Sequence, residues 1–208
     1  ASSCTEEWAG DGAPKLVQEL QRRGVELFLL CDEGGGIISE PIGGIPGNFA
    51  MVGVFEKGKA DVKFTAKSTG GHASAPGKHT PIARLAAFVN EAETHSPFKK
   101  KLLPEVAAMF RTLSGYASSF GLRLLLGNLW LFSPLLKAVL PAVSAQAGAM
   151  LKTTIAFTTQ SGSDAYNVLP QEATLGANMR FIPHQGEQES LAIIQRLAEK
   201  HGLSTEVL

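Results

Sequence analysis

The sequence is short of the residues that mark several protein classes. Only two cysteines, Cys4 and Cys31, occur among 208 residues, so a disulfide framework and a Cys-x-x-Cys metal pair are both excluded. Both lie beside acidic residues in apolar-flanked runs, which favours buried free thiols. Neither charge is in excess, because Lys plus Arg and Asp plus Glu each number 19. This balance offers no basic field to nucleic acid and no acidic tail to a basic partner.

A long uninterrupted hydrophobic run is also missing. The longest apolar tract, LRLLLGNLWLFSPLLKAVLPAV, contains Arg, Asn, Lys and two Pro residues, whereas a membrane span needs about 20 apolar residues. We therefore predict no transmembrane segment, and no signal peptide is evident. The sequence has no initial Met and opens in mid-pattern at ASSCTEEW, so we expect a fragment or a processed piece. The missing signal then says little about the parent protein.

The first 58 residues have the pattern of an α/β domain. Leu16, Val17 and Leu20 have helical spacing within 13–25, and Gly24 suits the end of that helix. The continuous apolar run at 26–36 predicts a buried strand that ends in glycines, and 49–58 predicts another. Acidic residues stand where the strands end, and in open α/β sheets ligands bind at the carboxyl ends of strands.

A different pattern begins near Gly58, which we interpret as a domain boundary. Apolar and polar side chains alternate along residues 60–68, which is typical of a strand with one solvent-exposed face. The segments that follow are an amphipathic helix at 80–93 with a Thr cap, a Leu-rich helical stretch at 98–150, strands at 150–162 and 172–183, a helix at 186–202 that stops at Gly202, and a strand at 204–208. This order, βαββαβ with a helical insertion, is the ferredoxin-like pattern.

Two pairs of adjacent acids are the first candidates for chemistry. Glu6 and Glu7 precede WAGDGA, and Asp32 and Glu33 precede GGG. Adjacent side chains at a strand end point in different directions, so one carboxylate can bind a metal while its neighbour acts as general base towards a metal-bound water. On spacing alone, solvated loop acids are the favoured interpretation of these residues, and oxygen ligands do not identify the metal.

Four segments in series carry a family resemblance: TEEWAGDGAPKLVQELQRRGV, LLCDEGGGI, EKGKADVKFTAKSTGGHASAP and SDAYNVLPQEATLGANMRF. In this order and at these intervals they resemble the two-zinc exopeptidase and aminoacylase family, which includes carboxypeptidase S, aminoacylase-1 and glutamate carboxypeptidase. The long Leu-rich tract is most similar to the carboxypeptidase S branch. That branch includes secreted enzymes that make and cleave N-acyl amino acids. The resemblance covers essentially the whole chain.

The resemblance implies specific roles for the acids. Glu6 corresponds to the general base and Glu7 to a zinc ligand, although Thr5 stands where the family usually has Asp. The next ligand is an acid of the Asp-Glu-Gly run, and we favour Asp32 over Glu33. The family's His-x-Asp element, its bridging Asp and a downstream His ligand are not in this chain, which has no His before His72.

The resemblance also implies an organisation and a function. Residues 1–58 would be the C-terminal portion of the first half of the catalytic domain, and 59–208 the lid and dimerisation domain, with a helical insertion at about 98–149. The full-length protein would be a hydrolase that uses two Zn²⁺ ions, or other divalent metals. It would cleave peptides or N-acyl amino acids with a free carboxylate, and form a homodimer through the lid. This piece alone would be inactive.

His72, in STGGHASAP, has three interpretations from the residues: a loop histidine, a metal ligand, or a substrate-facing imidazole. Gly70 and Gly71 permit a tight turn that would extend the ring. The family resemblance implies that this His reaches the partner subunit's active site and donates a hydrogen bond to the developing oxyanion. Ser74 is interpreted as a cap for the following segment.

Asn167 and Arg180 each have two interpretations. Asn167 is either a turn residue or, as the resemblance implies, a contact to substrate or oxyanion. Arg180 ends an amphipathic strand and is either a surface charge or a planar fork that grips the substrate's carboxylate.

The apolar tract at 120–143 also leaves alternatives. Packing in a core or dimer surface is favoured over a contact with an acyl chain or a membrane. Two further functions stay open: a dimerisation or binding module without catalysis, and an acyl-chain carrier, which would require an enclosed apolar pocket.

Overall fold

The computed structural model describes residues 11–29, 35–143 and 145–208, and divides the chain into two compact units, Ala1–Gly36 and Ile37–Leu208. Cys4 and Cys31 lie outside the described residues. In the first unit, helix α1 (Gly12–Arg22) confirms the helix predicted at 13–25. It buries none of its residues, and Leu16 and Val17 are exposed.

The prediction of a buried strand at 26–36 is wrong for residues 26–29, the first part of that range that the structure describes. Residues 26–29 form no strand, and Leu27, Phe28 and Leu29 are exposed. A buried strand needs neighbours that pair its backbone N–H and C=O groups, and no strand in the described part of the chain pairs with this segment. Strand geometry begins at β1 (Gly35–Ser39), which pairs with β2 (Asn48–Val52) as a two-stranded sheet.

The second unit contains the predicted ferredoxin-like element order. Its four-stranded sheet has the order β5-β7-β3-β8, in which every neighbouring pair is antiparallel. The strands are β3 (Gly58–Lys67), β5 (Thr154–Ser161), β7 (Glu172–Phe181) and β8 (Ser204–Val207). Helices α2 (Pro81–Thr94) and α7 (Gly186–Lys200) complete the βαββαβ motif and confirm the mixed α/β fold. The N-cap residue of α2 is Thr80, as predicted, but its side chain makes no capping hydrogen bond.

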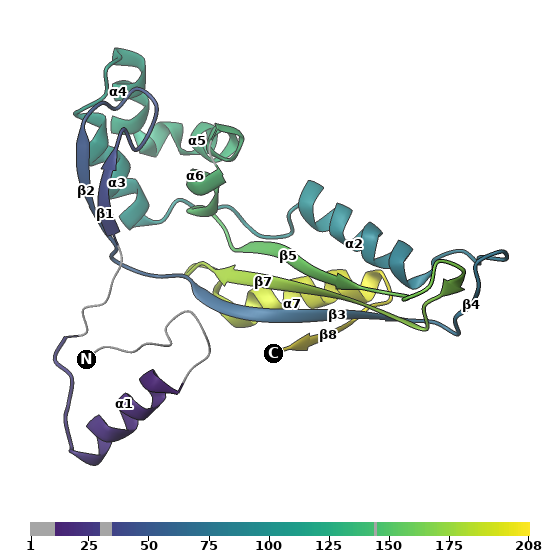
Figure 1. Cartoon of the computed structure of the whole chain (residues 1–208). Helices are drawn as coiled ribbons and strands as arrows, with labels where there is room; N and C mark the ends of the chain where they lie inside the picture. Colours follow the sequence, from purple (N-terminus) through teal and green to yellow (C-terminus); the bar gives the residue numbers. More distant parts are fainter. Residues whose placement is uncertain (1–10, 30–34, 144) are drawn as a thin grey trace. The chain divides into compact units, whose positions relative to one another are not determined.

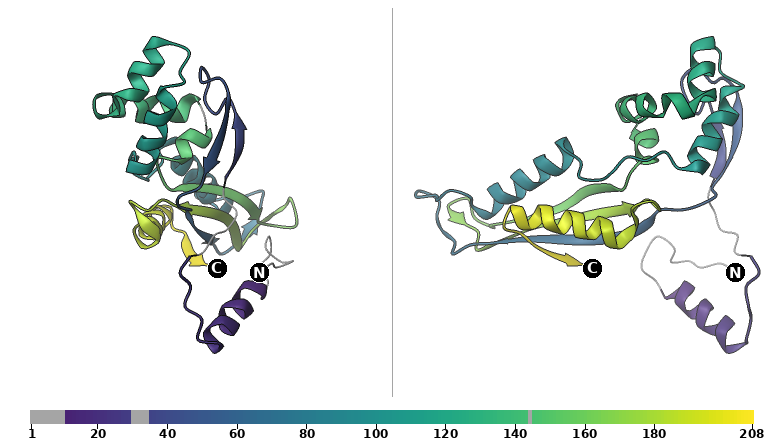
Figure 2. Two further views of the ribbon diagram at one scale, coloured as in Figure 1. Left: turned by 90° about the vertical axis from the view of Figure 1, so that its left-hand side faces the viewer. Right: turned by 180° about the vertical axis from the view of Figure 1, so that it is seen from behind.

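Helices α2 and α7 cover the same face of the sheet. The sheet lies in front of α7 in Figure 1 and behind α7 in the right-hand view of Figure 2. The covered face carries the alternating apolar residues Ala60, Val62, Phe64 and Ala66 of β3, all buried. Phe64 and Phe88 of α2 pack with ring centroids 4.7 Å apart. The alternation predicted for 60–68 is therefore confirmed, and the other face keeps the polar side chains.

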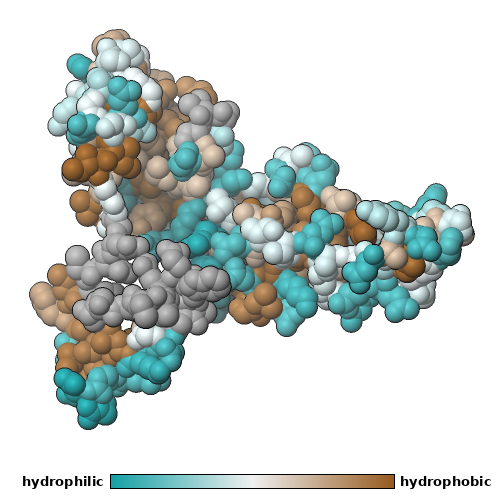
Figure 3. Space-filling view, in the orientation of Figure 1, coloured by the Kyte–Doolittle hydropathy of each residue, from teal (hydrophilic) through white to brown (hydrophobic). Residues whose placement is uncertain are grey.

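The insertion between α2 and β5 has a core of its own. It consists of α3 (Pro104–Ser114), α4 (Phe120–Gly127), α5 (Leu129–Val143) and α6 (Ala145–Ala149). Buried leucines of α3, α4 and α5 pack around Phe110, and Ile45 from the β1–β2 hairpin joins them. Packing thus accounts for much of the Leu-rich tract, while Phe120 and Trp130 remain exposed. Figure 3 shows hydrophobic patches beside hydrophilic ones over the hairpin and these helices, and a mostly hydrophilic surface with smaller hydrophobic patches along the sheet.

No single helix in the described ranges is long and apolar enough to cross a membrane. One pair of helices, Phe120–Gly127 and Leu129–Pro141, meets the length and composition criteria jointly, with a bend of 106° between its two parts.

A bulge in β5 depends on a glycine in β7. The register of the two strands shifts between Phe157 and Thr159, and Thr159 then faces Gly176. A Cβ atom added at Gly176 would meet the hydroxyl of Thr159, which leaves no space for a side chain. The bulge and the glycine therefore belong together in this register.

We predict that Gly176→Ala destabilises the fold by about 1–3 kcal/mol, the usual cost of forcing extra volume into a packed site. Thr159→Ala removes the clashing hydroxyl from an exposed position, so alone it should change stability little, and combined with Gly176→Ala it should recover most of the loss. Urea denaturation of the four variants of this cycle measures the coupling. Additive effects of the two substitutions would contradict the steric explanation.

Candidate functional site

The predicted site residues fall into two groups. Glu6, Glu7, Asp32 and the alternative ligand Glu33 lie outside the described residues, so their roles stay predictions. His72, Asn167 and Arg180 are described. Within 11–29, 35–143 and 145–208, no three His, Cys, Asp or Glu side chains are close enough to hold a metal ion together.

The His72 turn is built by two glycines and a small sheet. Gly70 has φ +70° and Gly71 has φ +147°, which are conformations that favour glycine. Strand β4 (Gly71–His72) pairs antiparallel with β6 (Val168–Leu169), so that His72 faces Val168. The sharp turn predicted from the glycines is thus present, and it projects from one end of the long strands (Figure 1).

The neighbours of the His72 ring set its hydrogen-bonding role. The backbone N–H of Ser74 donates to Nδ1 at 3.1 Å, and the Ser74 hydroxyl lies 2.8 Å from the same nitrogen. Because a backbone N–H can only donate, Nδ1 is the acceptor and the neutral ring carries its proton on Nε2. The exposed ring therefore presents an N–H donor outward. Ser74 orients the histidine, a role that its position two residues away could have suggested.

Asn167 lies beside His72 through the backbone. The N–H of Ala73 donates to the carbonyl oxygen of Asn167 at 2.9 Å. His72 and Asn167 are both exposed, as is Tyr166, which precedes Asn167. The structure therefore brings together two of the three described candidates, at the β4–β6 end of the sheet.

Arg180 lies at the other end of β7 and is held by a chain of polar contacts on the helix-free face. Its Nε donates to Oδ1 of Asn178 at 3.0 Å, and the Asn178 amide donates to Asp61 at 2.7 Å. The Asn178 hydrogen bond lowers the pKa of Asp61, and Lys59 and Arg180 lower it further. This anchoring uses Nε and leaves the terminal nitrogens of the guanidinium for a ligand.

The two ends of the sheet are too far apart for one small molecule. From Glu172 to Arg180, β7 spans about 27 Å at about 3.4 Å per residue, and His72 lies beyond the Glu172 end. His72 and Asn167 therefore cannot share a small substrate with Arg180 of the same chain.

Lys57 is a further residue near Arg180 that the sequence does not mark as a candidate. It is half-buried, and its Nζ donates to the carbonyl oxygen of Lys152 at 2.9 Å. Burial lowers its pKa to about 8, and the positive charges of Lys152 and Arg180 contribute. Arg180 thus belongs to a group of neighbouring cations. The sequence offered no signal for this group, because Lys57, Lys152 and Arg180 lie on three segments.

We predict that Gly70→Ala weakens the turn that carries His72. The new Cβ would lie 2.8 Å from Cγ of Gln171 and 3.2 Å from the Leu169 carbonyl oxygen, at a φ that disfavours alanine. The expected loss of stability is about 1–3 kcal/mol, with a change in the NMR signals of the His72 ring. Gly77→Ala is the matched control, since nothing lies within 4 Å of its Cβ. Equal effects of both substitutions would show that the turn does not depend on Gly70.

We also predict that Lys57 titrates near pH 8. Its pKa is lowered, so its charge is lost as the pH rises through about 8, well before an exposed lysine loses its own. Arg180→Met should raise the pKa of Lys57 because it removes a neighbouring positive charge. Lys59→Met removes an equal charge that does not act on Lys57, and should leave the midpoint unchanged. NMR titration of ¹³C-labelled lysine side chains reports each value, and a Lys57 midpoint near 10.5 would refute the prediction.

Comparison with known proteins supplies the family. The model of the peptidase dimerisation domain of the M20 group matches residues 54–206. The N-fatty-acyl-amino acid synthase/hydrolase PM20D1 of Xenopus tropicalis is 35% identical over 203 residues, which are 95% of this chain and 38% of that protein. A probable carboxypeptidase S-like protein of Dictyostelium discoideum is 32% identical over 169 residues, which are 81% of this chain and 32% of that protein.

A solved M20 family metallo-carboxypeptidase from Sulfolobus solfataricus is 17% identical, with a TM-score of 0.45 over 74% of this chain and 42% of that one. The chain spans less than half the length of the curated relatives named above. Its match to the family model nevertheless extends over most of the 208 residues. The chain belongs to the M20 peptidase dimerisation domain family.

Proposed function

We propose that the full-length protein is a metal-dependent hydrolase that cleaves the amide bond of peptides or N-acyl amino acids with a free carboxylate. Family membership supports this, as do relatives named as an N-fatty-acyl-amino acid synthase/hydrolase and a carboxypeptidase. Residues 1–58 would belong to the catalytic domain and 59–208 would be the lid. Glu6 would act as general base, and Glu7 and Asp32 as ligands of a divalent metal, for which we propose two zinc ions.

The observation that carries the proposal is the separation of the described residues. His72 and Asn167 occupy one end of the sheet and Arg180 the other, about 27 Å away along β7. A single substrate can contact all three only if they come from two copies of the chain. We therefore propose a homodimer through the lid, in which each active site takes His72 and Asn167 from the partner subunit.

Each described residue has a chemical role in such a site. The Nε2–H of His72, fixed by Ser74, donates to the oxygen that becomes negative when water attacks the amide carbonyl. Arg180 binds the substrate's carboxylate through its free terminal nitrogens. Arg180 faces Lys59, directly after the predicted catalytic segment, so it would serve the site of its own chain.

Mixing experiments test this arrangement in the full-length protein. His72→Ala and Glu6→Ala should each abolish most hydrolysis of an N-acyl amino acid in the presence of zinc. When the two inactive variants are unfolded, mixed and refolded together, half of the dimers should be mixed. Each mixed dimer should hold one complete site, so we expect about a quarter of the wild-type activity.

The matched control combines Arg180→Met with Glu6→Ala. If Arg180 and Glu6 serve the same site within one chain, no mixed dimer has a complete site and activity stays low. Absence of rescue for the His72 pair would overturn the partner contribution. Retained hydrolysis by Glu6→Ala alone would overturn its role as base. An inactive full-length wild-type protein that still dimerises would favour a binding module without catalysis.

A further inference from the structure

Polar side chains on the helix-free face of the sheet connect Arg180 to strand β3. Lys59 and Asp61 of β3 lie opposite Arg180 and Asn178 of β7. The Asn178 amide donates to Oδ1 of Asp61 at 2.7 Å, and its Oδ1 accepts from Nε of Arg180 at 3.0 Å. Asn178 therefore separates the carboxylate of Asp61 from the guanidinium of Arg180 and contacts both.

The two neighbours determine which side chain suits position 178. The hydrogen bond from Asn178 is the main cause of the lowered pKa of Asp61, so this carboxyl group is ionised at neutral pH. An ionised carboxylate only accepts hydrogen bonds and a guanidinium only donates them, so the group between them must do both. A carboxamide does both, and its two partners fix which side carries the oxygen. An ionised aspartate at this position would accept from Arg180 but could not donate to Asp61.

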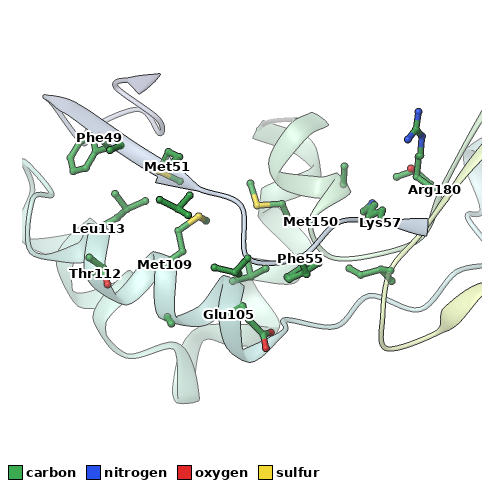
Figure 4. A pocket seen from close by; sticks show the side chains of 18 residues that line it. Phe49, Met51, Phe55, Lys57, Glu105, Met109, Thr112, Leu113, Met150 and Arg180 are labelled. Atoms are coloured by element: carbon green, nitrogen blue, oxygen red, sulfur yellow. The ribbon is translucent and has the colours of Figure 1, made fainter. Parts of the chain in front are cut away.

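The charges of this group do not cancel, because it contains two cations and one carboxylate. Nζ of Lys59 lies 3.4 Å from Oδ2 of Asp61, so these two side chains form the ion pair. Arg180 forms no salt bridge in the part of the chain that the structure describes, and its amide contact uses only Nε. In Figure 4 its guanidinium points away from the carboxylate of Glu105. The positive charge and the two terminal nitrogens of Arg180 thus remain for a ligand.

A guanidinium that is held at Nε has a defined plane before any ligand binds. Its terminal N–H groups can then form two parallel hydrogen bonds to a planar carboxylate. Because the long side chain is already ordered, binding costs less conformational entropy. A neutral amide provides this order and leaves the positive charge intact, whereas a carboxylate in the same place would weaken the attraction for an anionic ligand.

We propose that Asn178 is a positioning residue for carboxylate recognition, which holds the guanidinium of Arg180 without neutralising its charge and is itself oriented by Asp61. The arrangement makes the site selective for a free carboxylate over the corresponding neutral amide. This inference rests on the role proposed above for Arg180. The competing explanation is that Asn178 and Asp61 form a cross-strand pair that only stabilises the sheet.

An exchange of the two side chains separates these explanations in the full-length protein. The double variant Asp61→Asn with Asn178→Asp keeps the size, the hydrogen-bond pattern and the net charge of the pair, but places the carboxylate directly on Arg180. We expect KM for an N-acyl amino acid to rise at least about threefold, with kcat changed less than about twofold. For the corresponding N-acyl amino acid amide, which has no carboxylate, kcat/KM should not fall.

A single substitution tests the anchoring itself. Asn178→Ala frees Nε of Arg180 and should raise KM for the N-acyl amino acid at least about fivefold. Thr174→Ala is the matched control, since Thr174 is a half-buried residue on the same strand and face. It contacts the Ser161 hydroxyl at 2.6 Å, outside the Arg180 group, so its loss should leave KM unchanged. Urea denaturation of both variants reports any loss of stability separately.

The geometry can also be tested without catalysis in the 208-residue chain. In protein with ¹⁵N-labelled arginine, the Nε–H of Arg180 should exchange with water at least about tenfold faster in Asn178→Ala than in the wild type or Thr174→Ala. NMR titration with acetate should give a dissociation constant at least about threefold higher for the exchanged double variant than for the wild type, and acetamide should show no such difference.

The possible results distinguish this inference from the proposed function. Equal KM values for the wild type and Asn178→Ala would overturn the inference, as would an equal loss of kcat/KM for the acid and its amide in the double variant. A wild-type full-length protein that hydrolyses neither substrate would overturn the proposed function. In that case the acetate titration still decides, and equal affinity of the wild type and the double variant for acetate would overturn the positioning role of Asn178.

Discussion

The antiparallel pairing of β3 with β7 is the constraint on which the rest of the second unit depends. Ten residues of each strand pair without interruption, from Gly58 opposite Phe181 to Lys67 opposite Glu172. The pairing places the apolar side chains of both strands on one face, where α2 and α7 cover them. It also separates the two functional ends, because the His72 turn follows Lys67 and Arg180 precedes Phe181. A shift of one residue would move Arg180 into the core face and break its link to Asp61.

Much of this architecture was predictable because its signals are local. The alternation at 60–68 predicts β3 within two residues of its observed ends, and 186–202 predicts α7, with Gly202 in the left-handed conformation beyond its end. The run at 26–36 shows the limit of such signals. Continuous hydrophobicity indicates that a segment can be buried, but the partner that buries it is a property of the tertiary structure.

The candidate site divides in the same way. The His72 turn could be predicted because two glycines directly precede the histidine, and glycine is what positive φ values favour. The anchoring of Arg180 could not, because Asn178 and Asp61 are 117 residues apart and meet only through the register of β3 with β7. The low pKa of Lys57 also depends on tertiary structure, because it is caused by burial and by the positive charges of Lys152 and Arg180, which are far from Lys57 in the sequence. Sequence patterns identify functional residues whose conformation is set by adjacent residues in the chain. They do not identify residues whose position and pKa are set by tertiary contacts.

The division between the two ends has a consequence for selectivity. Arg180 makes the carboxylate contact of the proposed active site, whereas His72 and Asn167 lie at the opposite end of β7. In a dimer built as proposed, recognition of the substrate's carboxylate would come from one subunit, and stabilisation of the oxyanion from the other. Ground-state binding and transition-state stabilisation would then reside on different copies of the chain. Substitutions at Arg180 should accordingly change KM at the active site of their own subunit, while substitutions at His72 change kcat at the active site of the partner.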